Sequence, residues 1–149
     1  MAKIAKPSDY YNLKNLWSLR NCNIEYGKAH KKFKERKYKD AKDNYETYIE
    51  EYNSVDWDAY YELALCYLHL SIPLKDDEEI KYLKQAKKHL EKIHKEKPNN
   101  KRYYRKFLEI SDVYTKRKAH RDIDHKLPLK LAEASDDELK QFRKEILGE

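Results

Sequence analysis

Three basic residues at the expected start of a helix form the clearest candidate for binding chemistry. Arg102, Arg105 and Lys106 are spaced i, i+3 and i+4, which places them on one face of that helix. A helix start carries partial positive charge, and guanidinium groups hold carboxylates or phosphates through paired hydrogen bonds. The three residues are therefore a candidate site for a carboxylate or phosphate, and the alternative is an ordinary solvated face.

Two further basic regions indicate a second kind of ligand. Residues 116–121 read Lys-Arg-Lys-Ala-His-Arg, and six lysines gather between residues 28 and 39. Basic residues among exposed tyrosines bind single-stranded nucleic acid through phosphate attraction and base stacking. Most of the fourteen tyrosines, however, lie at the spacing of core residues. Nucleic acid is therefore the alternative partner and not the first choice.

Patterns for catalysis and metal binding are weak. His120 and His125 flank two aspartates, but a spacing of five does not place both imidazoles on one helix face. The sequence contains no glycine-rich phosphate loop and no Gly-x-Ser-x-Gly motif. Cys22 and Cys66 lie in apolar helical patterns and are expected to be buried, reduced thiols. We expect no catalytic residue, no metal site, no cofactor and no enzymatic activity.

Composition favours one helical domain. A chain of 149 residues with 40% hydrophobic residues can bury a core, and only two glycines and four prolines disfavour a turn-rich β architecture. The sequence has neither an apolar run of membrane-spanning length nor a secretory signal, so we expect a cytoplasmic protein without a membrane partner. The net charge of +6 suits an acidic partner.

Caps and apolar periodicity set the expected helices. Residues 8 and 9, Ser-Asp, can cap a leading helix, and Asp56 and Asn100 can cap two later ones. Between residues 135 and 138, Ser-Asp-Asp-Glu has the pattern of a capping box, which opens a last helix carrying Leu139, Phe142 and Ile146. Pro128 requires a helix boundary before a short helix over residues 129–134.

The stretch from residue 33 to residue 41 resembles the tetratricopeptide repeat. That family commonly reads Phe-Lys-x-x-x-Tyr-x-x-Ala there, and this chain has Phe33, Lys34, Tyr38 and Ala41 at those positions. The family's first-helix pattern of aromatic, Leu, small and Tyr is matched at Tyr60, Leu63, Ala64 and Tyr67, and it returns 44 residues later at Tyr104, Phe107, Leu108 and Ser111. Beyond residue 114 the pattern fails.

The resemblance implies an all-α, superhelical array of about three antiparallel helix pairs, right-handed, with leading and capping helices. Small residues at Ala41, Ala64 and Ala86 are expected to be buried where helices stack, and a generic helical bundle is the alternative. The expected single domain, 1–149, comprises a leading helix (9–19), repeat 1 (22–53), repeat 2 with an extended inter-helix turn (56–98), a degenerate repeat 3 (99–134) and a capping helix (135–147). The connection from residue 71 to residue 79 is longer than the family's tight turn by about ten residues, part of which is expected to extend the following helix.

In the family, the first helices line a concave groove that binds an extended peptide or a partner helix. The groove positions, transferred one by one, are Tyr26, His30, Phe33, Lys34, Tyr61, Glu62, Leu65, Leu68, Arg102, Arg105 and Lys106. Co-chaperones of the family hold a carboxylate at five places that are occupied here by Tyr26, His30, Glu62, Arg102 and Lys106. The full clamp is therefore absent, and Glu62 opposes its charge.

The resemblance implies a non-enzymatic protein–protein interaction adaptor or co-chaperone-like scaffold. Its partner would be a protein or peptide segment with an acidic or carboxylate end. One alternative is a basic helical module that binds single-stranded nucleic acid. Another is a structural subunit that self-assembles into an oligomer, with the helix of Leu139, Phe142 and Ile146 filling a neighbour's groove.

Overall fold

A computed structural model describes residues 13–148, all of whose regular structure is helical. This part of the chain contains α1 (Leu13–Lys34), α2 (Tyr38–Glu51), α3 (Trp57–Ser71), α4 (Asp76–Glu96), α5 (Lys101–Lys118), α6 (Leu127–Glu133) and α7 (Asp136–Leu147). The predicted all-α class is confirmed. Within the same range, no helix has both the length and the apolar character needed to cross a membrane. The predicted cap at residues 8 and 9 lies outside the described residues.

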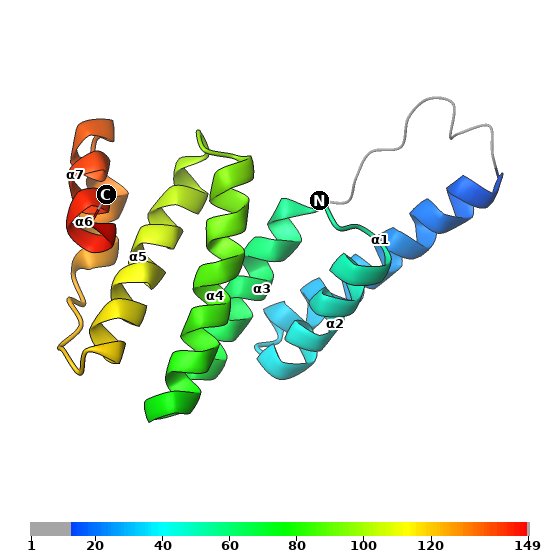
Figure 1. The fold of residues 1–149 in the computed structure, drawn as a ribbon. Helices are drawn as coiled ribbons and strands as arrows, with labels where there is room; N and C mark the ends of the chain where they lie inside the picture. The colour runs from blue at the N-terminus through cyan, green and yellow to red at the C-terminus, as the bar shows by residue number, and fades with distance from the viewer. Residues whose placement is uncertain (1–12, 149) are drawn as a thin grey trace. The chain divides into compact units, whose positions relative to one another are not determined.

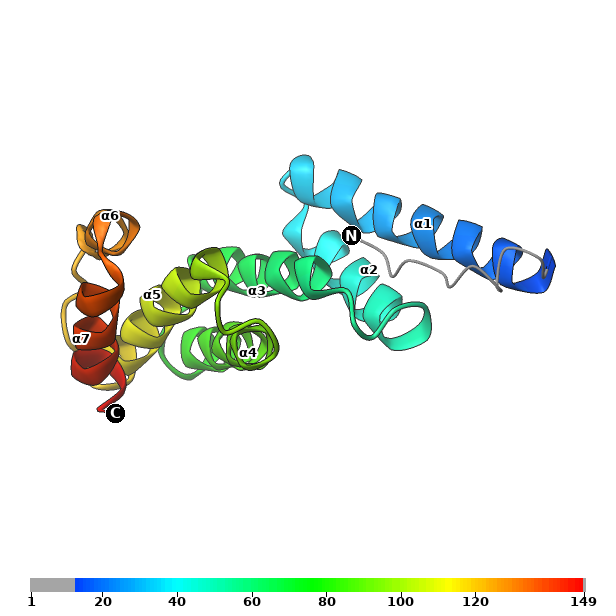
Figure 2. The same cartoon turned by 90° about the horizontal axis from the view of Figure 1, so that it is seen from above.

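The chain divides into two compact units, the first ending at His69 and the second beginning at Leu70. In the first unit α1 packs against α2, and α3 follows (Figures 1 and 2). In the second unit α4 packs against α5, and α5 also contacts α6 and α7.

The N-terminal helix differs from the prediction. We expected a leading helix over 9–19 and a separate helix from residue 22, but α1 runs without interruption through Leu13–Lys34. The two asparagines at the expected break, Asn21 and Asn23, each reduce helix propensity by less than about 1 kcal/mol relative to alanine. Neither proline nor glycine is present there to end the helix.

Helices α1 and α5 end in the same motif. At the end of α1 the N–H of Arg36 donates to Phe33 O at 3.0 Å and the N–H of Lys37 donates to Lys32 O at 2.9 Å. Arg36 has a φ of 60°, as the left-handed residue of this Schellman motif requires. At the end of α5, His120 takes the same role with a φ of 54°. The backbone geometry of both residues is one that glycine more often adopts.

The connection inside repeat 2 is shorter than predicted, and the predicted extension of the following helix at its start is confirmed. α3 ends at Ser71 and α4 begins at Asp76, which leaves only residues 72–75 between them. The additional length lies in α4, a helix of 21 residues. Four acidic residues occupy its first turn, where they stabilise the helix dipole, and no proline interrupts it before Pro98. The helix therefore extends towards its N-terminus, and the turn stays short.

The small residues at the predicted stacking positions are buried. Ala41 and Ala64 in the first unit and Ala86 in the second all have an exposed fraction of 0%. Their methyl groups allow neighbouring backbones to approach closely, as the repeat pattern predicted.

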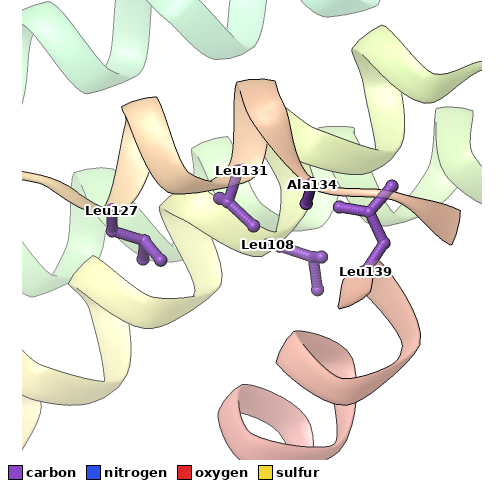
Figure 3. Close-up of a cluster of buried hydrophobic side chains, with 5 residues drawn as sticks. All are labelled: Leu108, Leu127, Leu131, Ala134 and Leu139. Atoms are coloured by element: carbon purple, nitrogen blue, oxygen red, sulfur yellow. The ribbon is translucent and has the colours of Figure 1, made fainter. Parts of the chain in front are cut away.

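A cluster of apolar side chains closes the second unit (Figure 3). Leu108 of α5 packs with Leu127 and Leu131 of α6, with Ala134, and with Leu139 of α7. The partly buried side chains that complete this cluster are Tyr104, Phe142, Ile146 and Leu147. The apolar side of α7 is thus occupied within its own unit.

The starts of α6 and α7 lie close to the positions that the sequence predicted. Pro128 lies in the first turn of α6, where its missing N–H costs nothing. Ser135 Oγ accepts from the N–H of Glu138 at 3.2 Å, and Glu138 Oε1 accepts from the N–H of Ser135 at 3.1 Å. The predicted capping box is confirmed.

Truncation of Leu139 tests the apolar cluster. Leu139→Ala removes a side chain that is 2% exposed and should lower the free energy of unfolding by about 2–5 kcal/mol. Leu129→Ala is the matched control, because Leu129 is 67% exposed. This change should alter the free energy of unfolding by less than about 0.5 kcal/mol. Urea denaturation followed by circular dichroism measures both, and equal midpoints for the two variants would contradict the assigned packing.

Candidate functional site

The carboxylate of Glu62 joins the three helices of the first unit. Glu62 lies on α3, and its Oε2 accepts from the hydroxyl of Tyr26 on α1 at 3.1 Å. The same oxygen accepts a short hydrogen bond from the hydroxyl of Tyr45 on α2. His30 Nδ1 on α1 lies 3.2 Å from Glu62 Oε1. The Glu62 side chain is only 14% exposed, so its charge is stabilised mainly by these neighbours.

The surroundings of the two tyrosines favour their neutral phenol forms. Burial is the main cause that raises the pKa of Tyr26, and the neighbouring Glu62 raises it further. Burial also raises the pKa of Tyr45, with the hydrogen bond to Glu62 as the next cause. Both tyrosines therefore remain donors at neutral pH. Glu62, predicted as a groove residue that opposes an anionic partner, has its charge satisfied by side chains of its own unit.

Two more acid–tyrosine pairs lie beside the first. Asp56 Oδ2 accepts from the hydroxyl of Tyr48 at 2.6 Å, and Cys22 Sγ lies 3.7 Å from that same hydroxyl as a donor. Glu46 Oε2 accepts from the hydroxyl of Tyr67 at 2.8 Å. Both pairs connect α2 with α3 or with the residue before it, so hydrogen bonds accompany apolar packing between these helices.

Both cysteines are free and buried, as the sequence predicted. Burial raises the pKa of the Cys66 thiol to about 12, and the negative charge of Glu62 acts in the same direction. Cys66 is therefore an unreactive, protonated core residue at neutral pH.

The predicted groove residues of the first unit differ in their exposure. Tyr26, His30, Phe33, Leu65 and Leu68 are half-buried, Lys34 is exposed, and Tyr61 is a core residue only 6% exposed. The Tyr26 and His30 rings are stacked with centroids 5.7 Å apart, and Phe33 meets Tyr38 edge-on at 5.9 Å. These aromatic and apolar side chains of α1 and α3 are thus, apart from Tyr61, neither fully buried nor fully exposed.

The three predicted cationic residues lie on α5 in the second unit. Arg102 is exposed, and Lys106 Nζ is 2.9 Å from Glu109 Oε2 on the same helix. Arg105 is half-buried, and its Nε has no hydrogen-bond acceptor among the described residues. The start of α5 is already capped, because Asn100 Oδ1 accepts from the N–H of Tyr103 at 3.1 Å. Lys106 is therefore partly neutralised by a carboxylate of its own helix.

A buried histidine that the sequence did not single out holds α7 to α4. His94 is 9% exposed and stacks on the ring of Tyr104 with centroids 4.5 Å apart. Its Nε2 lies 3.0 Å from Nη1 of Arg143 on α7. A guanidinium group only donates, so Nε2 must be the unprotonated acceptor of a neutral imidazole. Burial lowers the pKa of His94, and the charge of Arg143 lowers it further.

A cavity of about 660 Å³ in the second unit lies between the start of α4 and the end of α5. Its charged lining contains both signs, and Arg117 Nε lies 3.6 Å from Glu79 Oε2 there. Because these charged side chains pair with one another, the cavity does not favour an anionic ligand over a cationic one.

The histidines proposed as a weak metal pair, His120 and His125, are both exposed. Within residues 13–148, no group of three His, Cys, Asp or Glu side chains has the geometry to hold a metal ion.

Replacing Glu62 by glutamine should weaken the first unit. The amide oxygen can still accept from both phenols, but these bonds lose the negative charge that strengthens them, so the free energy of unfolding should fall by about 0.5–2 kcal/mol. Trp57 on α3 gives a fluorescence signal within this unit for urea denaturation. A double-mutant cycle with Tyr45→Phe should give a coupling of at least about 0.5 kcal/mol, and strictly additive effects would contradict the hydrogen bond.

The stability of the second unit should fall in mild acid because of His94. In the unfolded chain a histidine titrates near about 6.5, whereas the pKa of folded His94 is lower. Below a pH of about 6.5 the unfolded chain binds a proton that folded His94 does not, so the free energy of unfolding decreases as the pH falls. Above a pH of about 6.5 the full free energy of unfolding is retained. His94→Gln keeps an acceptor for Arg143 but cannot titrate, so its pH profile between pH values of about 5 and 7.5 should be flatter. Parallel profiles for the two proteins, measured by urea denaturation, would contradict this assignment.

Comparison with known proteins identifies no relative: no family model, curated protein or solved structure matches the chain.

Proposed function

We propose that the chain is a non-enzymatic adaptor of the helical-repeat type, similar to tetratricopeptide repeat proteins, in which the first unit binds a segment of a partner protein. The proposed binding face is formed by the half-buried residues of α1 and α3, namely Tyr26, His30, Phe33, Leu65 and Leu68. The superhelical stacking of repeats is part of the proposal.

The shared burial register of α3 and α5 is the observation that carries the proposal. Tyr60, Leu63, Ala64 and Tyr67 of α3 are all buried, and at the corresponding places of α5 so are Phe107, Leu108 and Ser111. Tyr104 completes the second set and is half-buried. Two helices that bury the same stripe are what a repeat architecture requires, because each repeat packs on its neighbours in the same way.

The chemistry of the proposed face favours apolar and aromatic side chains of a partner. Tyr26 is held at its hydroxyl by Glu62 and at its ring by His30, so it is already ordered before any partner binds. Ordered aromatic side chains lose little conformational entropy on binding, and recognition of an extended or helical segment commonly relies on such anchors.

The cations of α5 are proposed as a separate anchor for an acidic or carboxylate end. Arg102, Arg105 and Lys106 are the candidates, and Lys106 is partly neutralised by Glu109. The self-assembly alternative is less supported, because Leu139, Phe142 and Ile146 pack within their own unit.

The test uses peptides selected from a displayed library of short random sequences on the full chain. The double variant Leu65→Ala with Leu68→Ala should weaken binding of the selected peptides at least about tenfold, because hot-spot residues each cost more than about 1 kcal/mol. The matched control truncates two exposed apolar side chains, Ile24→Ala with Val55→Ala, each 46% exposed in the parent chain. Calorimetric titration measures affinity, and circular dichroism checks the fold.

A library that yields no ligand, or peptides that bind both double variants equally, would contradict the proposed face.

The anchor is tested with Arg102→Glu and Lys106→Glu together. Peptides with acidic residues should then bind more weakly, and unchanged affinity in a folded variant would show that the anchor is assigned wrongly.

A further inference from the structure

The second unit contains a concave basic surface that neither the groove residues nor the apolar cluster includes. A cavity of about 390 Å³ between α4 and α5 is lined by Lys84, Gln85, Lys87, Lys88, Glu91 and Tyr114. We call this the Tyr114 cavity. It belongs to one unit, so its geometry does not depend on how the two units are placed.

The charge of the Tyr114 cavity is almost entirely positive. Lys84, Lys87 and Lys88 make no ion pair with any carboxylate in the part of the chain that the structure describes. The one acid of the lining, Glu91, lies 3.5 Å from Lys95 and is thereby partly neutralised. Many other lysines of the chain do have acidic partners, such as Lys116, whose Nζ is 3.1 Å from Asp112 Oδ2. The cavity therefore has positive charge available for an external anion.

An aromatic ring lies at the centre of this charge. Lys87 Nζ is 5.1 Å from the ring centroid of Tyr114, and Lys118 Nζ is 5.7 Å from it. The ring is half-buried, and its hydroxyl has no hydrogen-bond partner among the described residues. The half-buried ring of Tyr114 thus interacts with two flexible ammonium groups.

We propose that the Tyr114 cavity binds single-stranded nucleic acid, with a base on the ring of Tyr114 and the adjoining phosphates on Lys84, Lys87 and Lys88. Base stacking on an aromatic ring is stronger than an exposed cation–π contact, so a base can displace an ammonium group from the ring. The displaced ammonium group then pairs with a phosphate of the bound strand.

Two features favour a nucleic acid over an acidic protein segment. Lysine and glutamate are depleted in protein–protein interfaces, whereas three lysines dominate this lining. Phosphate backbones, in contrast, are neutralised mainly by lysine and arginine, and an unpaired base supplies the flat group that a tyrosine ring accepts. A duplex would present no exposed base face for this purpose.

The experiment measures fluorescence anisotropy of labelled oligo-dT and oligo-U with the full chain at several salt concentrations. Lys84→Gln with Lys88→Gln removes two charges. The negative slope of log K against log salt should then become less steep by about 1.4, since each phosphate contact to a single strand contributes about 0.7. The matched control, Lys140→Gln with Lys144→Gln, removes two exposed lysines of the same spacing on α7 and should leave the slope unchanged. Both double variants have the same formal net charge.

Tyr114→Leu separates stacking from charge. This variant should weaken oligonucleotide binding at least about threefold while leaving binding of inorganic polyphosphate unchanged, because polyphosphate has no base to stack. A similar loss with oligo-dT and oligo-U would indicate that the sugar is not recognised.

Three outcomes would overturn the proposal. The first is the absence of saturable oligonucleotide binding at low salt. The second is an equal change of the salt slope in both lysine double variants, which would indicate diffuse attraction by net charge. The third is an equal loss of oligonucleotide and polyphosphate binding in Tyr114→Leu. None of these results depends on the peptide-binding face of the first unit.

Discussion

The hydrogen bonds from tyrosine hydroxyls to largely buried carboxylates are the constraint on which the first unit depends. An ionised acid taken out of water must be matched by donors, or its burial costs several kcal/mol. Glu62 meets this requirement with Tyr26 from α1 and Tyr45 from α2, and Asp56 does so with Tyr48. These bonds are directional, so they specify how the three helices approach one another more narrowly than apolar contact alone.

The helices of the second unit are held together by different contacts. Its interior around α6 and α7 is a leucine cluster, and its polar contact between α4 and α7 is a neutral imidazole that accepts from Arg143. A neutral acceptor avoids the burial of a second full charge beside the guanidinium group. Protonation of His94 in mild acid would therefore remove the acceptor that holds α7 to α4.

Polar side chains that pair within their own unit are less available to bind a partner. Glu62 and Lys106 occupy positions that the repeat resemblance assigned to a partner, yet both are engaged by neighbours in their own unit. The chemistry available to partners is then aromatic and apolar on the first unit, with His30 beside it. On the second unit it is cationic, at the arginines of α5 and around Tyr114. A chain with 40% charged residues can thus present two separate kinds of surface, because much of its charge is paired internally.

The sequence by itself determined the local features: the all-helical class, the caps at Asp56, Asn100 and Ser135, and the buried alanines of the stacking positions. Each of these depends on residues within one or two helical turns, which periodicity and capping rules describe well. The continuous α1 and the short connection before α4 were missed because weak helix formers and acidic residues are compatible with both turn and helix. Only the tertiary structure decided the partners of Glu62 and the contact between His94 and Arg143. Tyr26 and Tyr45 are 36 and 17 residues from Glu62, and Arg143 is 49 residues from His94, so these side chains meet only after the helices have packed.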